Sequence, residues 1–175
     1  MRAFVAVEVD PADRAARAPE HLTLEFLGEI DPGRVPPIGA ALEQVGNGVA
    51  PFELVLEGVG AFPSRTRPRV VWVGATRGRA AVIDLAARVA AALVPLGHVP
   101  PREAFEPHLT LFRVRGDRDR RRAIDLLEGR ESPPGPRTVH VDRFVLKESV
   151  LDARGATHRT LVTALLRGAG VRPDP

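Results

Sequence analysis

Two segments of the chain share the residues His-Leu-Thr-Leu and are its strongest candidates for chemistry. One copy begins at His21 and the other at His108, about half of the 175 residues further along. The alternative interpretation is that both are unrelated surface positions on amphipathic strands. Recurrence of the whole tetrapeptide in a chain with five histidines favours a functional pair.

Paired histidines suit proton transfer on the two sides of a phosphorus atom. In-line displacement needs one group to accept a proton from the attacking water and another to donate a proton to the leaving oxygen. Because the pKa of an imidazole lies close to neutral pH, modest environmental shifts decide which ring is protonated. Beside the two rings, Thr23 and Thr110 can each donate a hydroxyl group to a non-bridging phosphate oxygen.

Each copy opens an expected strand, at His21–Leu27 and His108–Val114. Side chains alternate along a strand, so His and Thr share one face while the leucines point to the core. The same alternation places Glu25 on the face of His21, which makes a metal site the rival interpretation. Neither copy has a further His, Cys or carboxylate at this spacing, and we expect no metal.

The composition fits one globular domain over residues 1–175. With 44% hydrophobic residues the chain can bury a core, and no apolar run is long enough to cross a bilayer. Met1–Asp10 lacks the apolar core of a signal peptide, so we expect a cytoplasmic protein with no membrane partner. We also expect a monomer. Since cysteine is absent, disulfides, zinc–thiolate sites and thiol nucleophiles are excluded.

The basic residues are almost all arginine, with Lys147 as the single lysine. Arginine suits bidentate contact with phosphate, although a GC-rich genome produces the same bias and is the preferred explanation. We expect the arginines of residues 118–122 to form a solvated helix face. The arginines of the turn at residues 63–69 are a better candidate for contact with RNA.

The rest of the chain alternates patterns typical of strands and helices. Strands are expected at Arg2–Val9, Phe52–Val59, Val70–Val73 and in one segment from Val139 to Leu146, whereas Thr160–Leu166 suits a strand or a short helix. Helices are expected from Asp31 to about Val45, at Ala80–Leu96 and at Asp117–Leu127. This order argues for an α+β fold with mostly antiparallel sheets.

Several segments, taken in order, resemble one known family. Residues 1–7, 20–29, 60–63, 69–74 and 105–113 are similar to the two-histidine (2H) phosphoesterases, and within them to the LigT-like RNA 2′,3′-cyclic phosphodiesterases once called 2′-5′ RNA ligases. The resemblance implies a bilobal fold of two pseudo-twofold-related lobes with flanking helices and a central cleft. It also implies hydrolysis of 2′,3′-cyclic phosphate on RNA ends or nucleotides to a 2′-phosphomonoester, without metal or cofactor.

The resemblance assigns roles to the motif residues. His21 is the general acid that protonates the leaving 3′ oxygen, and His108 is the general base that activates water. Thr23 and Thr110 hold the phosphate, and Arg113 adds a charged phosphate contact.

Some positions stand outside the family pattern or have two interpretations. Phe26 is a candidate for stacking on a nucleobase, with a core position as the equal alternative. Only about ten residues, 11–20, separate the first strand from the first motif, where family members carry a helix. His158 stands where the family often has Tyr and receives no role. His140 and His98 are interpreted as solvent-facing.

Three other functions stay open at this point. The first is a catalytically silent module that binds RNA ends, and retention of both full motifs speaks against it. The second is a 2H enzyme that acts on another small cyclic nucleotide. The third is the joining of RNA ends by 2′-5′ ligation, in which a ribose hydroxyl replaces water.

Overall fold

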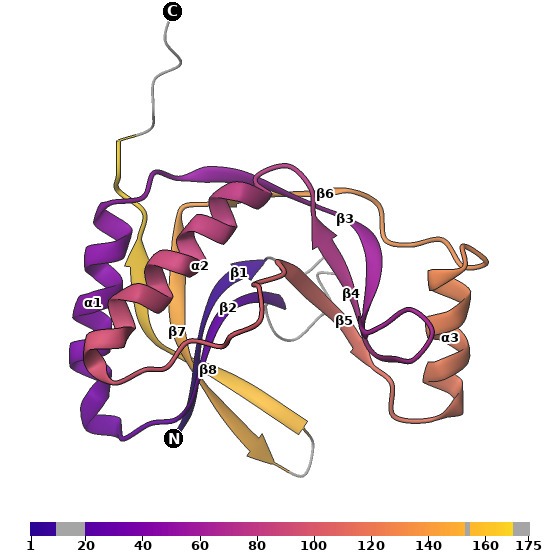
Figure 1. Ribbon diagram of the computed structural model, residues 1–175, viewed down its shortest axis with the longest axis horizontal. Coiled ribbons are helices and arrows are strands. Elements are labelled where there is room, and N and C mark those ends of the chain that lie inside the picture. The colour runs from indigo at the N-terminus through magenta and orange to yellow at the C-terminus, as the bar shows by residue number, and fades with distance from the viewer. Residues whose placement is uncertain (10–19, 153–154, 170–175) are drawn as a thin grey trace, which may run out of the picture.

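Two four-stranded antiparallel sheets, one in each lobe, form the framework of the protein in the computed structural model (Figure 1). The structure describes residues 1–9, 20–152 and 155–169. Sheet A contains, in spatial order, β2 (Glu20–Glu29), β1 (Arg2–Val9), β7 (Arg143–Asp152) and β8 (Gly155–Leu165). Sheet B contains β5 (His108–Arg113), β4 (Pro68–Ala75), β3 (Phe52–Pro63) and β6 (Arg137–Val141). The predicted α+β fold is confirmed.

The two motif strands occupy equivalent places in the two sheets. β2 is the edge strand of sheet A and β5 is the edge strand of sheet B, and the two strands lie against each other where the lobes meet. The short connection expected before β2 lies, apart from Glu20, outside the described residues.

The helices cover the outer sides of the sheets. Sheet A is covered by α1 (Val35–Asn47), which follows the 3-10 turn at Pro32–Arg34. The next helix, α2 (Arg79–Leu93), continues into a 3-10 turn at Val94–Leu96 and packs against β2 of sheet A and β3 of sheet B. In α2 the apolar residues recur at helical spacing and are buried, as predicted. The shorter α3 (Asp117–Leu127) packs on sheet B. None of the described helices is long and apolar enough to span a membrane.

The strand expected from Val139 to Leu146 is in fact two strands. The chain leaves sheet B at Val141 and enters sheet A at Arg143, so β6 and β7 belong to different lobes. The apolar positions change phase across Asp142, from Val139 and Val141 to Phe144 and Leu146, which is a local sign of the division. The pairing shows that there are two strands, because β6 pairs with β3 whereas β7 pairs with β1 and β8.

Candidate active site

A β-bulge at Leu24 shapes the first motif strand. The register of β2 on β1 passes from Thr23 directly to Glu25, so Leu24 is an extra residue. Leu24 and Glu25 are consequently both buried, whereas Phe26 lies on the face of His21 and is 66% exposed. The prediction that Glu25 shares the face of His21 is therefore wrong, and so is a core position for Phe26.

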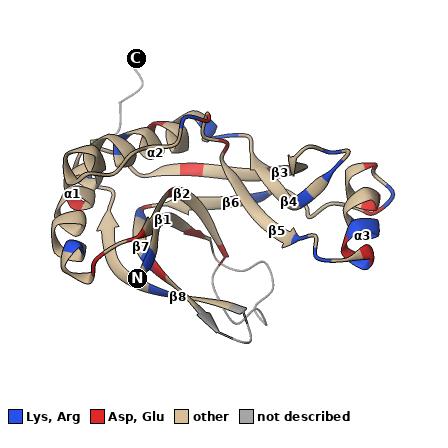
Figure 2. Cartoon of the chain, turned by 60° about the horizontal axis from the view of Figure 1, so that its bottom comes forward, with Lys and Arg blue, Asp and Glu red and all other residues tan. Residues whose placement is uncertain are grey.

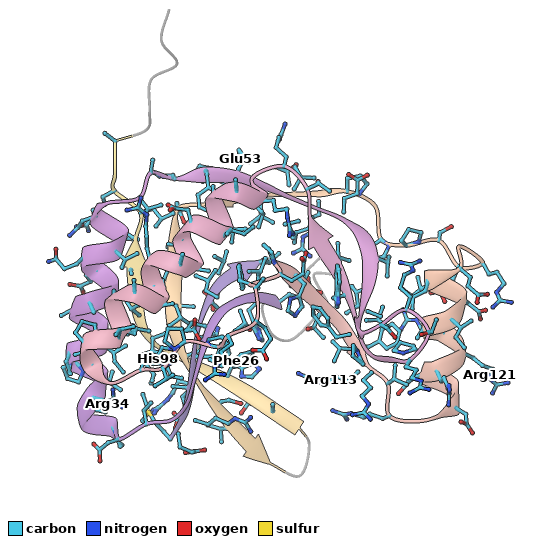
Figure 3. The ribbon with its side chains drawn as sticks, in the orientation of Figure 1. Phe26, Arg34, Glu53, His98, Arg113 and Arg121 are labelled. Atoms are coloured by element: carbon cyan, nitrogen blue, oxygen red, sulfur yellow. The ribbon has the colours of Figure 1, made fainter. Side chains whose placement is uncertain are left out.

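The second motif strand has the same irregularity at Leu111. The register of β5 on β4 passes from Thr110 to Phe112, which leaves Leu111 as the extra residue. Arg113 thereby joins His108 and Thr110 on one face, although regular alternation would point it to the other. Arg113 and Phe26 are thus equivalent in the two strands, and both are exposed between the lobes (Figure 3).

His21 is packed among other rings of sheet A. Its ring centroid lies 4.9 Å from that of Phe4 and 4.9 Å from that of His158. Burial lowers the pKa of His21 to about 4, with smaller contributions in the same direction from His158 and Lys147 and an opposing one from Glu8. The protein without substrate therefore keeps His21 neutral at neutral pH.

The single lysine of the chain is buried beside this ring cluster. Lys147 on β7 pairs in register with Phe4, is 3% exposed and forms an ion pair with Glu8. Glu8 in turn is the register partner of His21. A buried ion pair of this kind is costly to break, because removal of one partner leaves an unpaired charge.

His108 is held by a hydrogen bond as well as by ring packing. Its Nδ1 lies 2.7 Å from the carbonyl oxygen of Glu106, and because a carbonyl can only accept, Nδ1 carries the proton. The Nε2 atom is then free to accept a proton. Phe62 and Trp72 pack beside the ring, with centroids 4.9 Å and 6.0 Å away.

Arg79 fixes the position of Glu106 through two hydrogen bonds. Its Nη1 and Nη2 donate to the two carboxylate oxygens at 2.6 Å and 3.0 Å, and this contact lowers the pKa of Glu106. Arg79 is the first residue of α2, directly after Gly78, whose φ is 77°. A Cβ atom at Gly78 would lie 2.1 Å from the carbonyl oxygen of Glu53, so only glycine permits this start of the helix.

The structure corrects the interpretation of His98 and confirms that of His140. The His98 side chain is 10% exposed, and its Nε2 lies 3.1 Å from Oε1 of the buried Glu25, behind the bulge in β2. His98 therefore joins the loop that precedes β5 to the first motif strand. The His140 side chain is 62% exposed and pairs with Glu53 at 2.5 Å.

The arginine-rich segments are mainly structural or solvated. Arg65 donates to the carbonyl oxygens of Val59 and Leu127, which holds α3 against β3. The arginines of α3 are exposed and alternate with acidic residues (Figure 2), as expected for a solvated face. Within the described residues, no three His, Asp or Glu side chains come together as a metal site.

Sequence reasoning missed three residues of this site. Arg79 and Glu106 carry no motif that could reveal them, since their contact depends on how α2 packs. His158 did have a signal, because His158-Arg159-Thr160 repeats the His-x-Thr spacing of the two motifs.

Comparison with known proteins shows the family of this chain. The model of the 2′-5′ RNA ligase superfamily matches residues 5–152. An RNA 2′,3′-cyclic phosphodiesterase of Aeropyrum pernix is 34% identical over 86% of this chain and 84% of its own length. One of Archaeoglobus fulgidus is 34% identical over 92% of this chain and 98% of its own.

Solved structures agree with these relatives. A Thermus thermophilus protein superposes with a TM-score of 0.75 and 26% identity, over 97% of this chain and 100% of its own. Escherichia coli LigT in complex with 3′-AMP superposes with a TM-score of 0.69 and 25% identity, over 94% of this chain and 97% of its own. The chain therefore belongs to the 2′-5′ RNA ligase superfamily.

Proposed function

We propose that the protein is an RNA 2′,3′-cyclic phosphodiesterase that opens terminal cyclic phosphates to 2′-phosphomonoesters without a metal. The observation that carries the proposal is the pair of bulged His-x-Thr strands that meet between the lobes. The relatives named RNA 2′,3′-cyclic phosphodiesterase support RNA ends and cyclic nucleotides as substrates. A site built from one chain supports a monomer, and an RNA substrate supports a cytoplasmic location.

His108 is suited to the role of general base. With the Nδ1 proton donated to Glu106, the lone pair of Nε2 can accept a proton from water. The water oxygen then attacks phosphorus in line with the bond to O3′. Thr23, Thr110 and Arg113 lie on the motif faces, where they can donate to the non-bridging oxygens as charge develops.

His21 completes the reaction as general acid. As the P–O3′ bond breaks, its imidazolium gives a proton to O3′, and the phosphate remains on O2′. Because the pKa of His21 in the protein without substrate is lowered to about 4, the ring must take up its proton when the substrate binds. A phosphate anion in contact with the ring raises the pKa of His21, because it favours the charged form. Phe26, exposed on the same face, can stack on the terminal nucleobase.

The test is incubation with 2′,3′-cyclic AMP and identification of the product. We expect 2′-AMP, formed at the same rate with and without EDTA, and a kcat that is about 10²–10⁴-fold lower in His21→Ala and in His108→Ala. A product that is 3′-AMP would overturn the assigned direction of ring opening. Binding of 2′-AMP without any turnover by the native protein would identify a silent RNA-end binding module instead.

A further inference from the structure

A third His-x-Thr pair lies on β8. His158 and Thr160 are two residues apart on one face of the strand, and Thr160 pairs in register with Lys147 of β7. Lys147 pairs with Phe4 of β1, so this pair shares the face of sheet A that carries His21. The mechanism above uses neither of the two residues.

The curvature of sheet A brings this pair to His21. β2 and β8 are opposite edges of the sheet, with β1 and β7 between them. In a flat sheet their backbones would be about 14 Å apart, at about 4.8 Å for each pairing. The ring centroids of His158 and His21 are nevertheless only 4.9 Å apart, and Phe4 lies within 5.1 Å of both. The His158 ring is therefore part of the wall around His21.

The charges around His158 suit an anionic ligand. The groups that face it are His21 from β2, Lys147 from β7 and, through its ion pair with Lys147, Glu8 from β1. Burial and the charge of Lys147 lower the pKa of His158. A neutral imidazole still has one N–H to donate, and the exposed Thr160 adds a hydroxyl donor on the same face.

We propose that His158 and Thr160 are a third phosphate-binding pair of this site, with His158 donating a hydrogen bond to the terminal phosphate beside His21. The inference rests on the proposed function and adds a binding contact without a covalent step. It also gives a reason for a histidine at this place, since an imidazole donor lies within reach of a phosphate that contacts the His21 ring.

The decisive comparison uses His158→Phe, His158→Gln and His140→Phe. Phenylalanine keeps the ring contacts with Phe4 and His21 but removes the donor, and glutamine restores an N–H. His140 is the matched control, an exposed strand histidine of sheet B. With 2′,3′-cyclic AMP, we expect kcat/KM to fall about tenfold or more in His158→Phe, as for loss of a hydrogen bond to a charged group. Most of it should return in His158→Gln, and His140→Phe should match the native protein.

A second readout does not depend on turnover. Titration of the protein with 2′-AMP should shift the ring proton resonances of His158. 2′-AMP should bind about tenfold more weakly to His158→Phe than to the native protein. The pKa of His21, followed by NMR, should rise in His158→Phe, because the charge of His158 contributes to its lowering. Burial remains, so the pKa of His21 should stay below its ordinary value of 6.5.

Three results would overturn the inference. If folded His158→Phe keeps native kcat/KM and native affinity for 2′-AMP, the ring only packs against His21. If the loss appears with a dinucleotide that ends in a cyclic phosphate but not with 2′,3′-cyclic AMP, the contact is to the neighbouring phosphate. If His158→Phe and His158→Gln lose equal activity, the loss is not caused by removal of the hydrogen-bond donor of His158. If the native protein does not turn over 2′,3′-cyclic AMP, the proposed function is wrong. The titration with 2′-AMP still tests whether His158 binds phosphate.

Discussion

The two motif strands carry the same tetrapeptide and the same bulge, yet their histidines lie in different surroundings. His21 is half-buried against the rings of Phe4 and His158, and its pKa is lowered to about 4. His108 is tied through Nδ1 to the carbonyl oxygen of Glu106, with Nε2 left free. The repeat therefore fixes where the two rings lie, and the neighbouring strands decide how each ring holds its proton.

The difference comes from residues at matching places in the two sheets. The register partner of His21 is Glu8, whereas that of His108 is Gly74. In the rows of the equivalent residues Phe26 and Arg113, two strands further in, sheet A has the buried Lys147 where sheet B has Phe62. Sheet A thus adds titratable groups to the ring of Phe4 around its histidine. His108 is surrounded by aromatic rings of sheet B and by a backbone acceptor from the segment before β5.

The strongest challenge to this comparison is removal of either ring. Acid-base catalysis of this kind contributes about 10²–10⁴-fold, so His21→Ala and His108→Ala should each lower kcat by that factor. His140→Ala, at an exposed histidine, is the control and should be unaffected. Initial rates with 2′,3′-cyclic AMP measure the effect. Less than a tenfold loss in either variant would show that only one lobe performs the chemistry.

The equivalent positions Arg113 and Phe26 should differ in what they recognise. Arg113→Gln should lower kcat/KM for 2′,3′-cyclic AMP by about 10–100-fold, because a charged phosphate contact is lost. Phe26→Ala should raise KM by about tenfold, since base stacking contributes about 1–3 kcal/mol. Steady-state kinetics with 2′,3′-cyclic AMP and with a cyclic ribose phosphate that has no base separates the two. An equal effect of Phe26→Ala on both substrates would contradict the stacking role.

The lowered pKa of His21 predicts a pH dependence of stability. Below about pH 6.5 the unfolded chain binds a proton at this ring that the folded protein does not bind until about pH 4. The free energy of unfolding should therefore fall as the pH drops through this window, by on the order of 2 kcal/mol after allowance for solvent screening. Urea denaturation at several pH values measures it. His21→Gln should flatten the curve, and an unchanged slope in this variant would contradict the assignment.

The smallest expected effect concerns the hydrogen bond that holds His108. Arg79→Gln removes the clamp on Glu106 and should lower kcat by about threefold to tenfold, with little change in KM. Arg88→Gln is the matched control, because Arg88 forms an exposed ion pair with Asp84 on the same helix. Equal effects of the two variants would assign Arg79 only to helix stability.

Local sequence patterns predicted most of the elements. The apolar spacing in Ala80–Leu96 predicts a helix, and α2 with its 3-10 extension covers nearly the same residues. The division of Val139–Leu146 into β6 and β7 was not predicted, although the apolar positions change phase across Asp142. Which sheet a strand joins depends on partners that are distant in the chain.

The sequence by itself determined which residues we propose for the chemistry, since a repeated His-x-Thr places both side chains on one face of any strand. Tertiary structure decided what strand periodicity cannot encode. The bulges at Leu24 and Leu111 exist only relative to β1 and β4, and they turn Phe26 and Arg113 toward the motif histidines while they bury Glu25. The meeting of His158 with His21 requires a curved four-stranded sheet, because the two residues lie on its opposite edges.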